Sequence, residues 1–284
     1  MAMPDDVIAK VRVRIVQDLA AGRVEIPPFP RVAMELHKIA VSPNPDLFLA
    51  CKIIQREVEL AGRIVKAACS PLFGRRAVDT LDAAAARLGV EGLRDIAMMA
   101  SMGKLMRSSP LLEQARATTI HSFSVAVLTQ WVCAANRLDK KQGFLCGLFH
   151  DVGRLALIIV LEQYGRQDPI YLEPDMVRIV CERLHAQVGA VVLSSWGVHN
   201  APKFVAEHHH DALKAIGNDA PFARAVAIAD AADKLLELDV PSRIKQLSVD
   251  PVVVAAGIKK DLIETLAVGV DTVRADDMLV QMTT

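Results

Sequence analysis

A histidine and an aspartate stand side by side inside an apolar segment of this 284-residue chain, in the run Gly-Leu-Phe-His150-Asp151-Val-Gly-Arg-Leu that starts at Gly147. A buried imidazole and a buried carboxylate each cost several kcal/mol unless a partner compensates them. A divalent cation would satisfy both, because imidazole nitrogen and carboxylate oxygen are ligands for Zn, Mn, Fe or Ni. The alternative is a helix end, where Asp151 caps the next turn and His150 bonds a carbonyl.

The segments around this pair are expected to belong to an all-helical protein. Apolar residues make up 52% of the chain and aromatic residues only 4%, so Ala, Leu and Val supply most of the apolar mass. This balance favours helices over a sheet sandwich, which needs more aromatic and β-branched residues. No strand of ordinary length is apparent, and the length suffices for one large domain or two lobes.

Breaks rich in proline divide the sequence. The extended stretch Ile26 to Pro30 follows a first amphipathic helix, and a second break lies at Ser108-Ser109-Pro110. We predict an N-terminal helix at 1–23, a helical lobe at 24–110, a second helical lobe at 111–238 and a helical extension at 239–284. Apolar spacing predicts helices near residues 5–20, 31–41, 47–55, 58–69, 79–88, 91–107, 111–136, 140–150, 153–164, 174–195, 200–210, 221–238 and 258–269.

Charge, cysteine usage and hydropathy limit the classes of partner. Lys plus Arg and Asp plus Glu number 33 each, so no net charge favours nucleic acid or an anionic membrane. The five cysteines are dispersed without a CxxC pair, which argues against a disulfide framework and for a reducing compartment. The N-terminus does not resemble a secretory signal, and the longest apolar stretch, Leu155 to Leu161, is too short to span a bilayer. We therefore expect a cytoplasmic protein with no membrane or nucleic-acid partner.

Further polar residues are embedded in apolar helices on either side of His150. His121 lies near the start of the apolar face of its helix, where it is either a satisfied core histidine or a ligand. Asp230 sits in an alanine and valine run, and an acid there needs a partner. Asp233 shares its face at i+3 spacing, so it either orients a ligand or is a solvated charge.

A single histidine and a run of three histidines follow in the second lobe. His185 continues an apolar stripe, and three consecutive histidines stand at His208, His209 and His210. Successive residues on a helix point about 100° apart, so at most two of these three can serve one pocket. The alternative for the triplet is a solvated helix end.

Taken in order, these residues resemble a known group of proteins. His121, His150-Asp151 and Asp230 follow the H…HD…D pattern of the HD superfamily of metal-dependent phosphohydrolases, and His185 with His208-His209 resembles the extra ligands of its HD-GYP branch. The N-terminal half resembles an HDOD domain (HD-related output domain), and the similarity covers about residues 24–235. The motifs that carry the HDOD resemblance are Ile26-Pro27-Pro28-Phe29-Pro30, Ala67 through Gly74, and Ala83 through Val90 with Leu93-Arg94.

The resemblance implies an all-helical HD-type fold with an N-terminal helical lobe and a site in 111–238 for one or two divalent ions, chosen from Fe, Mn, Zn, Ni or Mg. It implies that the first ion is bound by His121, His150, Asp151 and Asp230, and the second by His185, His208 and His209, with Asp151 bridging. A shift of the last pair to His209-His210 is the alternative. No GYP-like tripeptide follows the triplet, and Arg154 replaces the lysine of HD-GYP proteins.

Two functions follow from the resemblance. One is a bacterial signal-transduction protein that keeps the metal pocket for structure or sensing and contacts a signalling protein partner. The other is a metal-dependent phosphohydrolase acting on a nucleotide, cyclic dinucleotide or other phosphate-containing small molecule. In that enzyme Asp151 and Arg154 would be the catalytic residues, with Arg154 neutralising phosphate charge.

Overall fold

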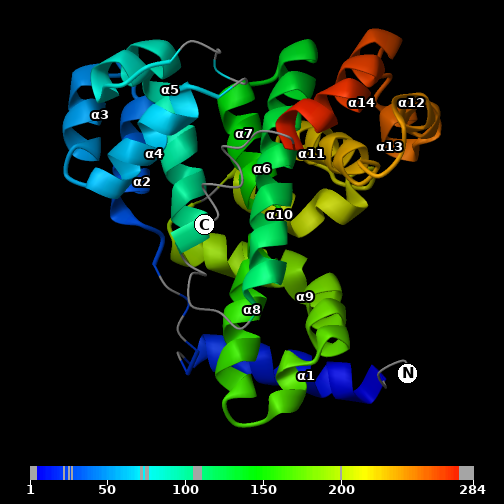
Figure 1. Cartoon of the computed structure of the whole chain (residues 1–284). Helices are drawn as coiled ribbons and strands as arrows, with labels where there is room; N and C mark the ends of the chain where they lie inside the picture. Colours follow the sequence, from blue (N-terminus) through cyan, green and yellow to red (C-terminus); the bar gives the residue numbers. More distant parts are fainter. Residues whose placement is uncertain are drawn as a thin grey trace. The chain divides into compact units, whose positions relative to one another are not determined.

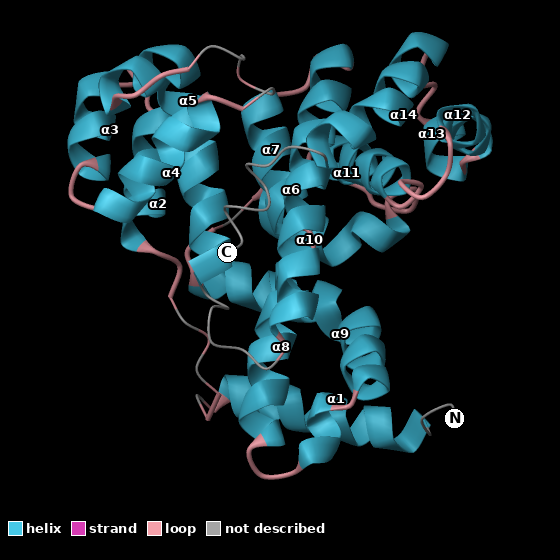
Figure 2. Cartoon of the chain, in the orientation of Figure 1, coloured by secondary structure: helices cyan, strands magenta, loops and turns pink. Residues whose placement is uncertain are grey.

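The computed structural model of this chain describes residues 5–21, 23–24, 26, 28–70, 73, 77–104, 111–198 and 200–274. Within these ranges every regular element is a helix and no strand occurs (Figures 1 and 2). The prediction of an all-α fold is therefore confirmed. The chain forms two compact units, one made of Met1–Pro28 with Ser108–Ala267 and the other of Phe29–Arg107 with Val268–Thr284.

The second of these units carries four helices from the N-terminal half: α2 (Arg31–Ala40), α3 (Leu47–Ile54), α4 (Val58–Ala68) and α5 (Leu81–Lys104). Asp46 begins α3 by accepting a hydrogen bond from the Leu49 amide at 3.0 Å, as an N-cap should. The two helices predicted at 79–88 and 91–107 are joined into α5, and the expected break survives as a kink at Gly89, whose φ is 64°. Only glycine adopts that backbone conformation without strain.

The first unit contains most of the helices that the structure describes. They are α1 (Asp5–Ala20), α6 (Leu112–Ala135), α7 (Lys140–Phe149), α8 (Val152–Gly165), η1 (Pro169–Leu172), α9 (Pro174–Ser195), α10 (Ala201–His208), η2 (His209–Asp211), α11 (Ala220–Asp233), α12 (Val240–Val249), α13 (Pro251–Ala255) and α14 (Lys260–Arg274), which passes beyond the unit after Ala267. By contact, the described helices of 1–23 and of 239–267 belong to this unit, and the predicted division into four segments stays a prediction.

Two close helix approaches define the interior of the first unit. A β-carbon on Gly147 of α7 would lie 2.6 Å from Cα of Ala126 on α6, and one on Gly153 of α8 would lie 1.9 Å from the backbone of α9. Neither site has room for a side chain, so the helices pack backbone against backbone. Helix α6 packs against both α7 and α11, and α8 lies against α9 (Figure 1). These contacts bring the polar residues of five segments into one region.

Helix α1 joins the first unit through a cation and two aromatic rings. The guanidinium of Arg14 lies 3.9 Å from the centroid of the Tyr164 ring and donates to the hydroxyl of Tyr171 at 3.1 Å. The Tyr164 hydroxyl in turn donates to Asp18 at 2.6 Å. Helix α1 is therefore held against α8 and η1 by specific contacts as well as by burial of Ile15.

One stretch of the described residues, Lys140–Gly165, is long and apolar enough to cross a membrane by length and composition. Its most apolar window is 89% buried inside the structure, and His150 and Asp151 divide it into α7 and α8. Helices buried in the core of a folded protein pass the same test, so the stretch is weak evidence for a membrane span.

Candidate metal centre

Five segments of the first unit direct histidine or aspartate side chains into one cluster. His121 comes from α6, the His150-Asp151 pair from the junction between α7 and α8, and His185 from α9. The remaining members are His209 and His210 from η2, and Asp230 with Asp233 from α11. The polar pair forms the junction itself, since α7 ends at Phe149 and α8 starts at Val152. The close approaches at Gly147 and Gly153 lie on either side of it.

Three overlapping groups in this cluster could each hold a metal ion, with ligand atoms that lie within 4.8 Å of one another. They are His121, His150 and Asp230; His150, Asp151 and His209; and His185, His209 and His210. His150 belongs to the first two groups and His209 to the last two, so the three groups form one continuous cluster. Residues that are 109 positions apart in the sequence, from His121 to Asp230, therefore meet in one place.

Most imidazoles of the cluster are oriented by the backbone of their own helix. Nδ1 of His150 bonds the carbonyl of Gly147 at 2.7 Å, and Nδ1 of His185 bonds that of Cys181 at 2.6 Å. Nδ1 of His209 lies 3.1 Å from the Val205 carbonyl. A carbonyl only accepts, so each Nδ1 carries the proton and each Nε2 presents its lone pair, the form in which a neutral histidine binds a metal.

His121 is oriented by a carboxylate instead. Its Nδ1 lies 2.7 Å from Oδ2 of Asp233, while its Nε2 lies 3.4 Å from Oδ1 of Asp230. The side chain of Asp233 is only 1% exposed, so it is placed to orient His121 and is not a solvated charge. Carboxylate-histidine pairs of this kind fix the ring and increase the basicity of the ligating nitrogen.

Each of the two central carboxylates has one oxygen paired with a basic side chain and one oxygen without a hydrogen bond. Oδ2 of Asp151 accepts from Nε of Arg154 at 2.7 Å, and Oδ2 of Asp230 accepts from Nζ of Lys234 at 2.6 Å. Both Oδ1 atoms are buried and lack a hydrogen-bond partner among the residues that the structure describes.

The unpaired oxygens face imidazole nitrogens. Oδ1 of Asp151 lies 3.1 Å from Nε2 of His185 and 3.6 Å from Nε2 of His209. Buried carboxylate oxygens opposite nitrogen lone pairs repel one another unless a proton or a cation lies between them. The donor set and the orphaned oxygens therefore fit a divalent ion.

The histidines differ in protonation. Burial lowers the pKa of His150 to about 3, and burial likewise lowers the pKa of His185 to about 4, so both rings are neutral near pH 7. Burial also disfavours the charged form of His121, but the carboxylates of Asp230 and Asp233 outweigh it and raise the His121 pKa to about 9. At neutral pH the cluster thus combines the neutral rings of His150 and His185 with the positively charged ring of His121.

The carboxylates in the cluster stay ionised. Burial acts to raise the pKa of Asp151, but the neighbouring His150, His209 and Arg154 hold it well below its usual range. The pKa of Asp230 is lowered in the same way, with burial outweighed by the neighbouring His121 and His150 and by the charge of Lys234. Anionic oxygens are what a hard or borderline divalent cation requires.

The structure places the histidine triplet in the register that the sequence had kept as the alternative. His208 does not join the groups found among the described residues: its ring stacks on Phe204 with centroids 4.3 Å apart, and its Nδ1 bonds the Phe204 carbonyl at 2.9 Å. His210 is directed to the cluster instead, with its Nε2 2.7 Å from Nε2 of His185. Helix α10 ends at His208, and the tighter turn of η2 directs the buried His209 and the exposed His210 toward His185.

Lys234, one turn after Asp230, is absent from the residues selected by sequence. The sequence feature that could have indicated this contact is the i+4 spacing of Lys234 from Asp230, an aspartate in an apolar run.

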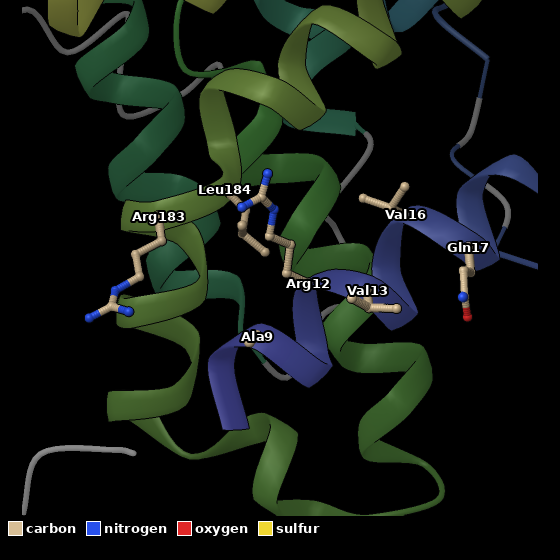
Figure 3. A pocket seen from close by; sticks show the side chains of 7 residues that line it. All are labelled: Ala9, Arg12, Val13, Val16, Gln17, Arg183 and Leu184. Atoms are coloured by element: carbon tan, nitrogen blue, oxygen red, sulfur yellow. The ribbon is translucent and has the colours of Figure 1, made fainter. Parts of the chain in front are cut away.

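A separate hollow lies between α1 and α9 and is shown in Figure 3. Arg12, Val13 and Val16 of α1 and Leu184 of α9 line it. Leu184 precedes the cluster residue His185, but no member of the cluster lines this hollow. The candidate metal centre is thus distinct from it.

These features define a class of protein, an all-helical protein that gathers histidines and aspartates from successive helices around one buried centre. Comparison with known proteins gives the family, since residues 26–212 match the HDOD domain. The chain belongs to the HDOD family. The matched range contains every cluster residue except Asp230 and Asp233.

Solved structures of similar fold cover nearly the whole chain. An HDOD domain protein of unknown function from Geobacter sulfurreducens is 20% identical, with a TM-score of 0.73, over 93% of this chain and 99% of its own. A protein from Shewanella amazonensis SB2B, provisionally named a metal-dependent phosphohydrolase, is 18% identical with a TM-score of 0.66 over 92% and 99%. A provisionally named signal transduction protein from Marinobacter aquaeolei VT8 is 20% identical with a TM-score of 0.61 over 91% and 60%. Identities this low show the fold alone.

A curated relative is an uncharacterised protein of Treponema pallidum (strain Nichols), 22% identical over 255 residues and 85% of this chain. The chain spans about half the length of that relative, 48%.

Proposed function

We propose that this HDOD protein binds one or two divalent metal ions at the histidine-aspartate cluster and acts in bacterial signal transduction through a protein partner. The observation that carries the metal site is the pair of buried carboxylate oxygens, Oδ1 of Asp151 and of Asp230, which lack a hydrogen-bond partner in the described part of the chain. Oδ1 of Asp151 lies 3.1 Å from Nε2 of His185, which the bond from Nδ1 to the Cys181 carbonyl leaves with a lone pair. Oδ1 of Asp230 lies 3.4 Å from Nε2 of His121, whose proton a metal ion would replace.

The ligands divide by position within the cluster. His121, His150 and Asp230 would hold one ion, and His185, His209 and His210 would hold another, with Asp151 near both groups. Five imidazoles and two carboxylates favour Zn, Mn, Fe or Ni over Mg, which prefers oxygen ligands and retained waters.

Signalling is supported by the family and by the name of the Marinobacter structure. The second unit, whose described helices bury an apolar core, is a separate body that could contact a partner. A cytoplasmic location completes the proposal, in keeping with the absence of CxxC pairs. The chain spans about half the length of its curated relative. The protein partner and the signalling response that it would cause are therefore also part of this proposal.

A second candidate function is phosphoester hydrolysis, and one observation favours it. The side chain of Arg154 is 26% exposed and sits on Oδ2 of Asp151, where its guanidinium could also contact a phosphoryl oxygen. A divalent ion bound in the cluster would supply a Lewis acid beside it. The Shewanella structure bears the corresponding name.

Metal content of the purified protein and its variants tests the first proposal. We expect bound transition metal in the wild type and its loss, by at least tenfold in affinity, in His209→Ala and Asp151→Asn. His208→Ala is the matched control, because His208 neighbours His209 but packs on Phe204, and it should keep its metal. Wild-type protein that takes up no divalent ion from Zn, Mn, Fe or Ni would sink the proposal.

Turnover separates the two functions. The metal-loaded wild type is offered nucleotides, cyclic dinucleotides and simple phosphate esters, with His150→Ala as the inactive reference. Signalling alone predicts no metal-dependent hydrolysis, although His150→Ala would still lose metal. Hydrolysis that requires both the metal and His150 would establish the enzyme.

A further inference from the structure

The two basic side chains at the rim of the cluster have matching positions. Lys234 donates to Oδ2 of Asp230, and Arg154 donates to Oδ2 of Asp151, so each leaves the buried Oδ1 facing imidazoles. The side chain of Lys234 is 57% exposed. Exposed ion pairs contribute little to stability, so the contact calls for another explanation.

A carboxylate can bind a metal through one oxygen or through both. If both oxygens of Asp230 were available, they could chelate one ion and fill a coordination position that an external ligand would otherwise occupy. The Lys234 contact engages Oδ2 and leaves Oδ1 facing Nε2 of His121. The positive charge of Lys234 also opposes a divalent cation nearby, as Coulomb's law requires.

We propose that Lys234 is a positioning residue that restricts Asp230 to single-oxygen metal ligation and thereby keeps one coordination position open at the cluster. This inference rests on the proposed metal site. It gives Lys234 a role on α11 that matches the contact of Arg154 with Asp151 on α8. The cluster would then bind its metal with lower affinity than the same ligands could reach without Lys234. In return, the metal would have a coordination position accessible to an external ligand.

The inference makes an unusual prediction for Lys234→Met. Loss of the lysine removes a repulsive charge and frees Oδ2, so Co²⁺, used as a spectroscopic probe, should bind about tenfold more tightly. Its visible absorption should change, because the second carboxylate oxygen of Asp230 would replace an external ligand of the ion. Lys234→Arg should restore both the affinity and the spectrum of the wild type.

Calorimetric titration with Co²⁺ and visible spectroscopy of the full chain test this, with thermal unfolding to verify that each variant folds. Lys260→Met is the matched control, because Lys260 forms an exposed i,i+4 pair with Glu264 at 3.6 Å on α14 and changes the net charge equally. Wild type that binds Co²⁺ while Lys234→Met shows unchanged or weaker binding overturns this inference and leaves the metal site standing. Wild type that binds no Co²⁺ overturns both.

Discussion

A β-carbon on Gly153 would lie 1.9 Å from the backbone carbonyl oxygen of His185. The first turn of α8 therefore touches the α9 backbone at the position of a candidate metal ligand, and Asp151 stands only two residues before that contact. The distance of 3.1 Å between Oδ1 of Asp151 and Nε2 of His185 depends on this approach.

Gly153→Ala should consequently damage both stability and metal binding. Its methyl group meets backbone atoms that cannot rotate away, so the helices must separate, at a cost of about 3 kcal/mol or more. Chemical denaturation should show the loss, and metal affinity should fall with it. Gly62→Ala is the control: no atom lies within 4 Å of its β-carbon, and replacing a helical glycine should stabilise by about 0.5–1 kcal/mol. Unimpaired Gly153→Ala protein would contradict the close approach.

Asp233 should matter for metal affinity although it is not itself proposed as a ligand. Asp233→Asn keeps a hydrogen-bonding group next to Nδ1 of His121 but removes the charge that orients and polarises the ring. We expect metal affinity to fall about 10- to 100-fold, as for other outer partners of metal-bound histidines. Competition with a chelating dye would measure it. Asp261→Asn, on the exposed face of α14, should leave affinity unchanged, and an equal loss there would discredit the specific role of Asp233.

Metal binding should release a proton near neutral pH. His121 has a pKa of about 9 without metal, so its ring is protonated at pH 7 and the incoming ion must displace that proton. Affinity should therefore rise with pH, about tenfold per unit, and level off above about pH 9. Calorimetric titrations in buffers of different ionisation enthalpy report the number of protons released. If metal binding released no proton at pH 7, His121 would not be a ligand.

The metal-free protein should lose stability in mild acid. The folded-state pKa values of His150 and His185 are about 3 and about 4, below the value of about 6.5 expected for the unfolded chain. Between pH 6.5 and 4 the unfolded chain binds more protons, so the free energy of unfolding falls as pH falls, by about 1.4 kcal/mol per unit for each histidine. Urea unfolding at several pH values measures the slope. His185→Gln should show a shallower slope, and an unchanged one would mean that His185 titrates normally.

A site residue could be predicted from the sequence where its neighbours along the chain determine its role, and not where packing determines it. Asp151 and Asp230 could be selected from sequence because an acid in an apolar run needs a partner wherever the helices go. The choice between His208 and His210 could not, because it depends on where α10 tightens into η2 and on the Phe204 ring that holds His208. Lys234 was missed for a related reason, since an exposed lysine carries no burial signal. The kink at Gly89 was predicted as a break, but whether two helices merge across it depends on packing.

The division of α7 from α8 also bears on how the chain is synthesised. The stretch Lys140–Gly165 has the length and composition of a bilayer-spanning segment, although it contains His150, Asp151 and Arg154. A charged residue near the centre of such a stretch carries about 2.5–3.5 kcal/mol of insertion penalty, so Asp151 is a strong local signal against recognition by the membrane-insertion machinery. Replacing the pair with leucines would leave Arg154 as the only charged residue near the centre and would lower the insertion penalty of the segment. The two residues that build the centre thus also mark the segment, during synthesis, as the interior of a folded protein.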